Sequence, residues 1–417
     1  MELRRVVITG LGALTPIGNT CDEYWKSLLL GVSGAEPITR FDASKFKTQF
    51  ACEVKNFDVL QYMDVKESRK MDLFSQFAIA TSTEAIKDSG IDLSSINLDR
   101  MGVIWGSGIG GFTACYEEVR NFTLGGDEPR FNPFFIPKII GDIAAGLISI
   151  QFGLRGPNYV TTSACASSAN AISDAFNMIR LGKADIIVTG GSEAPIISPG
   201  VGGFNAMQAL STRNDDPKTA SRPFDKGRNG FVIAEGSGAL ILEDLDHALR
   251  RGAKIYAEVG GCGLSSDAYH LTAPHPEGAG ARAAMKYALE DAMISINEID
   301  HINTHGTSTP LGDIAETKAI LSLFGEHAYS ININSIKSMV GHLLGAAAAV
   351  ETVATVLTIY HDIVPPTINH FEDDENLDNR LNFTFNKAQN RVVNYALSNA
   401  FGFGGHNTSI LFKKYKS

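Results

Sequence analysis

The sequence has little of what marks a nucleic-acid or membrane protein. Its 36 lysines and arginines are outnumbered by 46 aspartates and glutamates, so the net charge is −10 at pH 7. A generic binder of nucleic acid or of anionic lipid is therefore not expected. No uninterrupted apolar run approaches the roughly 18–20 residues that cross a bilayer. The early apolar segment is broken by Gly10, Gly12 and Pro16, unlike a signal peptide. We expect a cytoplasmic protein without a nucleic-acid or membrane partner.

Cysteine is scarce, and its spacing is irregular. The sequence has five cysteines and no C-x-x-C pair; they are Cys21, Cys52, Cys115, Cys165 and Cys262. An odd number of widely separated cysteines argues against a disulfide framework and against a zinc module, and it favours a reducing compartment. One of them is then free to act as a nucleophile.

Low-complexity segments and linkers rich in proline or serine are also missing. Apolar residues make up 44% of the 417 residues and charged residues 20%, which excludes a mostly disordered chain. Glycine is in excess, with 41 copies, against an average near 7% of residues. Length and composition together predict a large globular protein.

The glycines gather at the ends of short apolar runs that are rich in β-branched residues. These runs are 6–12, 101–111, 184–191, 256–263 and 399–405. Runs that are apolar without alternation indicate strands buried on both faces. Segments with helical spacing lie between the runs, notably 74–89 and 279–292. We therefore predict an α/β fold in which helices cover both faces of a sheet.

The order of these elements occurs twice along the chain. In each half a helix, a strand, a loop, a second strand and a helix of small residues follow one another, and the small-residue helices are expected at 166–181 and 343–360. Such a repeat predicts two similar halves fused into one body. We place the halves at 1–255 and 256–417, with the two small-residue helices buried at the centre.

Cys165 is the cysteine with a setting suited to chemistry. It follows the β-rich run 159–163 and precedes a segment of small residues, so we expect it on a strand-to-helix turn. A helix N-terminus has unpaired N–H groups and about half a positive charge, which favours a thiolate over a thiol. The same N–H groups can stabilise an oxyanion. From the turn alone, an inert buried thiol remains the commoner alternative.

Two histidines occupy comparable positions. His305 follows the apolar run 299–303, and His342 follows Lys337 and Gly341 at a second strand-to-helix junction. Each histidine taken alone is more often a satisfied core residue than a catalyst. Zinc coordination by Cys165, His305 and His342 is disfavoured, because no pair of them has the close spacing of metal ligands. We predict no metal.

Taken together, these motifs resemble the β-ketoacyl-acyl-carrier-protein synthases, the decarboxylating condensing enzymes of the thiolase superfamily. The resemblance covers nearly the whole chain. Its motifs occur in the order of the family: 6–12, the turn at Cys165, 305–307, 337–342 and 402–405. The Cys-His-His set at this spacing is very specific, and the type II synthases of dissociated fatty-acid synthesis resemble the chain most closely.

The resemblance implies a thiolase-like five-layer αβαβα fold of two mixed-sheet halves, usually as a homodimer. It implies that Cys165 takes an acyl chain from a carrier-protein thioester. Backbone N–H groups of Cys165 and Phe403 would form the oxyanion hole. His305 and His342 would bind the malonyl thioester and stabilise the enolate that forms as carbon dioxide leaves.

The resemblance assigns further residues to supporting roles. Lys337 would support the histidines, Glu351 would orient Lys337, and Thr307 and Thr309 would bind the pantetheine arm. The acyl pocket and its gate would be formed by Ile109, Phe134 and Phe403. The implied partner is acyl carrier protein, acyl- or malonyl-loaded, and its docking patch would include Arg69, Lys70 and Arg130. No cofactor is implied, because phosphopantetheine arrives on the carrier substrate.

Related proteins would carry other residues. A degradative thiolase needs a second catalytic cysteine near the C-terminus, and none follows Cys262. A type III initiating synthase would have asparagine at the position of His342. A polyketide ketosynthase is the principal alternative. From other classes, a non-catalytic chain-length partner would have lost Cys165, and a metal-binding structural protein would be revealed by elemental analysis. We predict a type II 3-oxoacyl-[acyl-carrier-protein] synthase that adds two carbons to an acyl chain.

Overall fold

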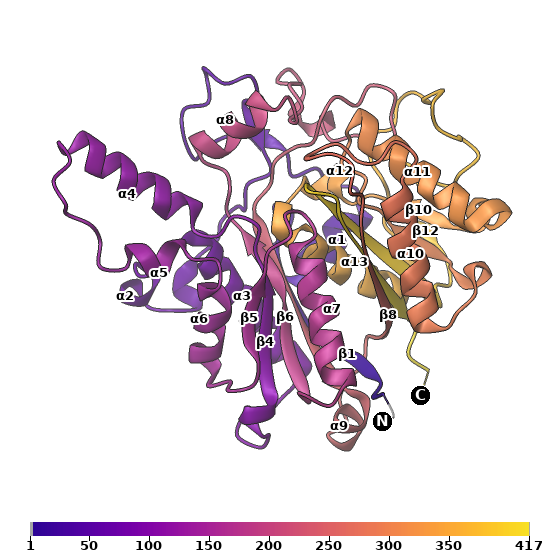
Figure 1. Ribbon diagram of the computed structural model, residues 1–417, viewed down its shortest axis with the longest axis horizontal. Helices are drawn as coiled ribbons and strands as arrows, with labels where there is room; N and C mark the ends of the chain where they lie inside the picture. The colour runs from indigo at the N-terminus through magenta and orange to yellow at the C-terminus, as the bar shows by residue number, and fades with distance from the viewer. Residues whose placement is uncertain (1–2, 417) are drawn as a thin grey trace.

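The computed structural model describes residues 3–416, in which ten strands form one continuous sheet (Figure 1). From edge to edge the order is β10-β9-β13-β14-β8-β1-β7-β6-β4-β5. The strands of the first half are β1 (Val6–Leu14), β4 (Met101–Gly106), β5 (Asn158–Thr161), β6 (Ile186–Glu193) and β7 (Gly236–Asp244). Those of the second half are β8 (Ala257–Ser266), β9 (His301–Asn303), β10 (Asn332–Asn334), β13 (Tyr395–Gly402) and β14 (His406–Lys413).

The two halves of the sheet have the same topology. When the five strands of each half are counted along the chain, they lie side by side in the order third, second, fourth, fifth, first. The third, second and fourth strands are parallel to one another. The fifth strand pairs antiparallel with the fourth, and the first pairs antiparallel with the fifth. The halves join where Val6–Ile8 of β1 pair antiparallel with 257–259 of β8. The family resemblance implies two mixed sheets, whereas here this short ladder links them into one. Each first strand is the edge of its own half, and the pairing satisfies backbone groups that an edge would leave free.

Helices cover both faces of each half-sheet and give five layers. On the outer side of the first half lie α3 (Leu73–Ser89) and α6 (Ile143–Phe152), and on the outer side of the second lie α10 (Ala279–Ala292) and α11 (Pro310–Phe324). Between the halves, α7 (Ser167–Arg180) packs against α13 (Ala347–His361), and each contacts strands of both halves. The predicted α/β fold with covered sheet faces is confirmed.

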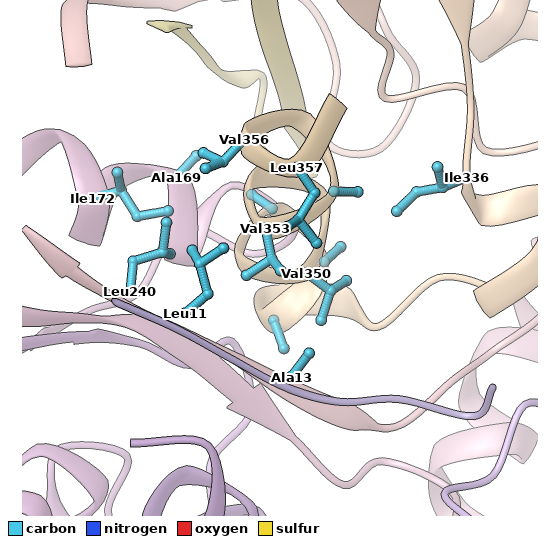
Figure 2. Packing of buried hydrophobic residues seen from close by; sticks show 14 of the residues in the cluster. Leu11, Ala13, Ala169, Ile172, Leu240, Ile336, Val350, Val353, Val356 and Leu357 are labelled. Atoms are coloured by element: carbon cyan, nitrogen blue, oxygen red, sulfur yellow. The ribbon is translucent and has the colours of Figure 1, made fainter. Parts of the chain in front are cut away.

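The central helix α13 is buried on nearly all sides. Its Val350 and Val353 belong to the same buried cluster as Leu11 of β1, Leu240 of β7 and Ala169 of α7 (Figure 2). The helical run Leu344–His361 is apolar and long enough to cross a membrane, but 89% of it is buried inside the molecule. It is therefore the core helix of this fold.

The remaining elements lie at the periphery or at the site. They are α1 (Cys21–Leu29), α2 (Val65–Ser68), α4 (Phe112–Leu124), α5 (Phe135–Ile139), α8 (Ser198–Ala206), α9 (Leu245–Arg250), α12 (Lys337–Val340) and the short strands β2 (Glu36–Pro37), β3 (Phe50–Ala51), β11 (Ile363–Val364) and β12 (Gln389–Asn390). The pair α4 and α5 projects from the body at the left of Figure 1.

Candidate active site

Cys165 lies on a sharp turn between β5 and α7. The preceding Ala164 has φ +50°, a left-handed conformation that non-glycine residues adopt rarely. The turn is fixed by the Ser167 hydroxyl, which accepts the N–H of Ser163 at 2.9 Å and donates to the carbonyl of Ala164 at 2.6 Å. Cys165 is 8% exposed. The chain thus holds the thiol at the end of a buried turn.

His342 reaches the thiol from the second half of the chain. Its backbone N–H donates to the carbonyl of Val232 at 2.7 Å, and its own carbonyl accepts the N–H of Ala234 at 3.0 Å. The ring of Phe231 meets the imidazole edge to face at 5.2 Å. Held in this way, His342 Nε2 lies 3.1 Å from Cys165 Sγ.

His305 follows β9 and faces the same space. Its ring centroid lies 5.3 Å from that of His342, at an interplanar angle of 85°. The N–H groups of His305 and Gly306 both donate to the buried carboxylate of Glu316 on α11, at 3.0 and 2.9 Å. Glu316 is a positioning residue that the sequence analysis does not identify.

Lys337 and Glu351 form a fully buried ion pair behind the histidines. The Lys337 ammonium, at the start of α12, donates to the Glu351 carboxylate on α13, and each side chain is 1% exposed. Glu351 is therefore placed to fix the direction of the Lys337 side chain. Neither residue lines the cavity that Cys165 opens into.

Burial dominates the protonation states at the site. It raises the pKa of the Cys165 thiol to about 12, although the Lys337 charge and the N–H of Phe403 lower it. Burial and the Lys337 charge hold the pKa of both His305 and His342 well below the usual range. At neutral pH the resting site therefore contains a thiol and two neutral imidazoles. From sequence, a helix terminus is expected to favour the thiolate. In the structure α7 begins only at Ser167, and the cost of desolvation outweighs the field of the helix.

A cavity of about 600 Å³ opens in front of these groups. Of the residues predicted from sequence, the lining includes Cys165, His305, His342, Ile109, Thr307, Thr309 and Phe403. The two threonine hydroxyls lie 3.0 Å apart on one wall. Phe134 lies outside the set of described residues that line this cavity; it is 39% exposed, and its ring is 5.8 Å from the Lys70 ammonium.

The loop after β13 closes the cavity beside the nucleophile. The backbone N–H of Phe403 lowers the pKa of the Cys165 thiol, so it lies on the side of the sulfur where an oxyanion-hole donor is needed. Gly404 and Gly405 follow with φ of +86° and +75°. The N–H of Gly404 donates to the carbonyl of Leu271 at 2.8 Å, which ties this loop to the segment after β8.

The basic residues predicted to dock a carrier protein all reach the surface. Arg69 follows the short helix α2 and is exposed, and Lys70 next to it pairs with Glu67. Arg130 lies between α4 and α5, where its side chain is 88% exposed and pairs with Glu128 at 3.1 Å. The carboxylates beside Lys70 and Arg130 partly offset their charges.

The catalytic candidates also form a set of possible metal ligands. One ligand atom from each of Cys165, His305 and His342 lies within 4.8 Å of the others. Their sequence spacing does not reveal this, because three separate loops supply them. Sulfur and nitrogen ligands of one tetrahedral zinc ion lie about 3.5 Å apart. The 3.1 Å contact between Cys165 and His342 is shorter and has hydrogen-bond length.

Comparison with known proteins relates the chain to one family. Residues 3–248 match the family described as "Beta-ketoacyl synthase, N-terminal domain", and residues 256–371 match "Beta-ketoacyl synthase, C-terminal domain". Over 416 residues the chain is 49% identical to a 3-oxoacyl-[acyl-carrier-protein] synthase 2 of Synechocystis sp., covering 100% of this chain and 99% of that protein.

Solved structures show the same similarity. A β-ketoacyl synthase from Burkholderia phymatum superposes with a TM-score of 0.92 at 35% identity, covering 99% of this chain and 100% of the other. A ketosynthase bound to the hexaketide, in complex with its type II polyketide acyl carrier protein, superposes with a TM-score of 0.91 at 33% identity, with both chains fully covered.

Proposed function

Because the chain belongs to the β-ketoacyl synthase family, we propose that it is a type II 3-oxoacyl-[acyl-carrier-protein] synthase, a condensing enzyme of fatty-acid elongation. A relative of that name at 49% identity over the full length supports this function. The observation that carries the proposal is the 3.1 Å contact between Cys165 Sγ and His342 Nε2, with His305 facing the same cavity.

The first half-reaction is acyl transfer to Cys165. The sulfur attacks the thioester carbonyl of an acyl carrier protein, and the bond between that carbonyl carbon and the pantetheine sulfur breaks. The thiol proton passes through His342, the nearest base at 3.1 Å, to the leaving pantetheine thiolate. The N–H groups of Cys165 and Phe403 stabilise the oxyanion of the intermediate.

The second half-reaction joins two carbons to the chain. The carbonyl oxygen of a malonyl thioester accepts hydrogen bonds from the N–H groups of His305 and His342, and for this step His342 takes the tautomer that is protonated on Nε2. The carbon–carbon bond to the malonyl carboxylate breaks and carbon dioxide leaves. The electron pair of the broken bond stays on the thioester fragment and forms an enolate. The enolate carbon attacks the Cys165 thioester, and the bond from the acyl carbon to sulfur breaks. The 3-oxoacyl product leaves on the carrier, and the released Cys165 thiolate takes up one proton from solvent to restore the thiol. Imidazoles with a low pKa suit this step because they donate while neutral.

Other residues support binding and order. The ion pair between Lys337 and Glu351 holds the Lys337 positive charge in place behind the imidazoles. Thr307 and Thr309 bind the pantetheine arm in the cavity. Ile109 gates the acyl pocket together with Phe403; Phe134, predicted as a third member of this gate, does not line the cavity. The reaction needs no metal and no cofactor beyond the phosphopantetheine of its substrate.

The partner in this proposal is acyl carrier protein. The related ketosynthase that is complexed with its acyl carrier protein supports such a partner. The exposed Arg69 and Arg130 and the partly buried Lys70 supply the positive charge for an acidic carrier. Five free thiols agree with a cytoplasmic location.

We further propose that the protein is a homodimer built on β5. This strand is an edge of the sheet, and edge strands offer unpaired backbone groups to a second chain. The helix α6 packs against β5, and exposed apolar side chains lie along the stretch from α4 to α6, namely Leu124, Phe131, Ile136, Ile140 and Ile150. Sedimentation equilibrium should give twice the chain mass.

The proposed division of the chain near residue 255 is supported by β8, which begins at Ala257 and is the first strand of the second half.

The test of the proposed function separates its two half-reactions. Cys165→Ala should abolish condensation and keep some decarboxylation of malonyl carrier protein. His305→Ala and His342→Ala should each lower decarboxylation by about 10²–10³-fold, the usual cost of removing one such donor. Cys262→Ala is the matched control and should keep turnover. Chain extension by Cys165→Ala, or decarboxylation at the wild-type rate in both histidine variants, would contradict the proposal.

Two alternatives predict different results. A polyketide ketosynthase, favoured by similarity to the hexaketide-bound ketosynthase, would repeat condensations without reduction between them. Its products would be poly-3-oxo chains. A metal-binding role for the three clustered side chains predicts a stoichiometric metal in elemental analysis and its loss in Cys165→Ala.

A further inference from the structure

Glu193, the last residue of β6, is a fully buried acid that lies directly under the loop carrying Ile109. Its Oε1 accepts the backbone N–H groups of Gly108 and of Ile109, the latter at 3.1 Å, and the hydroxyl of Ser107 at 3.4 Å. The residue is 0% exposed. Its other oxygen, Oε2, has no partner among residues 3–416. A single carboxylate oxygen thus accepts hydrogen bonds from three consecutive residues.

The position of this carboxylate is tightly restricted. Gly345, which follows His342 by three residues, approaches so closely that an added Cβ would lie 2.6 Å from Glu193 Oε1 and 2.4 Å from the nitrogen of Gly108. The acid therefore lies where the loop at 107–109 meets the segment after His342.

We propose that Glu193 is a positioning residue that holds the Ile109 loop in the conformation that obstructs the acyl pocket, and that it thereby sets which chain lengths acylate Cys165. The inference rests on the proposed function and deepens it. Ile109 lines the cavity next to the nucleophile. A long chain must displace this side chain, whereas a short chain need not.

The hydrogen bonds to Glu193 explain why displacement has a cost. Moving the loop separates the N–H groups of Gly108 and Ile109 from their acceptor and leaves buried donors unpaired. A charged acceptor strengthens such bonds relative to a neutral one. The ionisation of Glu193 therefore sets how firmly the loop is held.

Two other ionisable groups face Glu193. Asp72, at the start of α3, raises the pKa of Glu193 and itself accepts the N–H of Ala114 on α4 at 2.8 Å. Cys165 is the second, and the charge of Glu193 raises its pKa. Burial is the larger cause and brings the pKa of Glu193 to about 7. As pH rises through 7 the acid ionises, the loop is held more firmly, and long chains should load more slowly relative to short ones.

The experiment measures the rate of Cys165 acylation by butyryl and by myristoyl carrier protein, using intact-protein mass, at pH 6 and pH 8. The ratio of the long-chain to the short-chain rate removes effects common to both, such as ionisation of Cys165. In the wild type this ratio should fall as the pH rises. In Glu193→Gln the acceptor stays neutral, so the ratio at pH 8 should rise about fivefold and its pH dependence should vanish.

Glu84→Gln is the matched control. Glu84 is also a largely buried acid with a pKa of about 7, and it accepts two backbone N–H groups, from Ala13 and Cys21, at 2.8 Å. Its donors lie in β1 and α1 rather than in the gate loop. The wild-type ratio and its pH dependence should persist in this variant.

Several results would overturn the inference. The first is an equal change of both rates in Glu193→Gln, which would assign the residue to packing. The second is a pH dependence that persists in Glu193→Gln, which would assign the effect to Asp72. The wild-type ratio is informative even if that variant does not fold, because a ratio independent of pH also contradicts the inference. If neither carrier acylates wild-type Cys165, the proposed function itself fails.

Discussion

The buried charge of Lys337 acts on three groups together. It lowers the pKa of the Cys165 thiol and of both imidazoles, and it is paired with Glu351. Removing Lys337 alone would leave Glu351 as an unpaired buried charge, at a cost of about 3–5 kcal/mol in stability. The double variant Lys337→Met/Glu351→Gln removes both charges, so it isolates the electrostatic effect from that cost.

We predict that this double variant makes the Cys165 thiol less reactive. The Lys337 charge lowers the pKa of the Cys165 thiol more than the Glu351 charge raises it, so removing both should raise this pKa further and leave less thiolate at pH 9. The rate of Cys165 alkylation by iodoacetamide should fall about tenfold, as expected for one nearby charge. Cys165→Ser supplies the background from the other cysteines. A rate at or above that of the wild type would show that the charge of Lys337 does not tune the thiol.

The sequence points to Cys165, His305 and His342 as candidates because each follows an apolar run and precedes small residues, and the family resemblance assigns their catalytic roles. It does not identify Glu193 or Glu316. Both work by accepting backbone N–H groups, and a backbone donor has no signature in the side chains of a sequence. The only sequence signal is that Glu193 comes two residues after the apolar run 184–191 and its glycines.

At the level of elements, the patterns succeed where they are uninterrupted. The predicted helix 279–292 coincides with α10, and the apolar run 101–111, predicted as a buried strand ending in glycines, begins with β4. Pattern analysis does not identify β7 and β14. Their apolar cores, 239–242 and 410–412, are short and are flanked by polar residues and glycine. Pairing with neighbouring strands defines these two elements more than their own composition does.

The loop at 107–111 carries Ile109, and a substitution there tests whether this loop limits the length of the acyl chain. Ile109→Phe should block acylation by medium and long chains while sparing short ones, because a larger ring fills the cavity that Ile109 lines. Rates of Cys165 acylation across carrier proteins of different chain length measure this. An equal loss at all lengths would point to misfolding and would remove Ile109 from the acyl pocket.

Phe403→Ala tests the other side of the gate. The two glycines after Phe403 have left-handed φ and permit a backbone swing that an aromatic gate requires. Without the ring, malonyl carrier protein should enter before acyl loading, so unproductive decarboxylation should increase. The ratio of carbon dioxide released to product formed measures this. An unchanged ratio would show that Phe403 only fills space.

At the scale of the whole molecule, the net charge of −10 opposes an encounter with an acidic carrier protein. Local basic residues must therefore outweigh the net field near the entrance. Arg69→Glu with Lys70→Glu should raise KM for carrier substrates and weaken the salt dependence of KM. The matched control is Arg282→Glu with Lys286→Glu, which reverses two exposed charges on α10. An unchanged KM at low salt would discard Arg69 and Lys70 as the docking site.

The α/β class and the repeated order of elements could be predicted from glycine positions and apolar runs. The five layers came from the family resemblance, because no local pattern tells which helices lie between two half-sheets. The ladder between β1 and β8 could not be predicted. It joins residues about 250 positions apart, and neither strand carries a signal for its partner.

The central claim is that Cys165 carries the growing acyl chain. Intact-protein mass spectrometry after incubation with acyl carrier proteins of several chain lengths tests it most directly. The account predicts a gain of one acyl group per chain, located on the peptide that contains Cys165 and absent in Cys165→Ala. An unmodified protein, or an acyl group on Cys21, Cys52, Cys115 or Cys262, would contradict it.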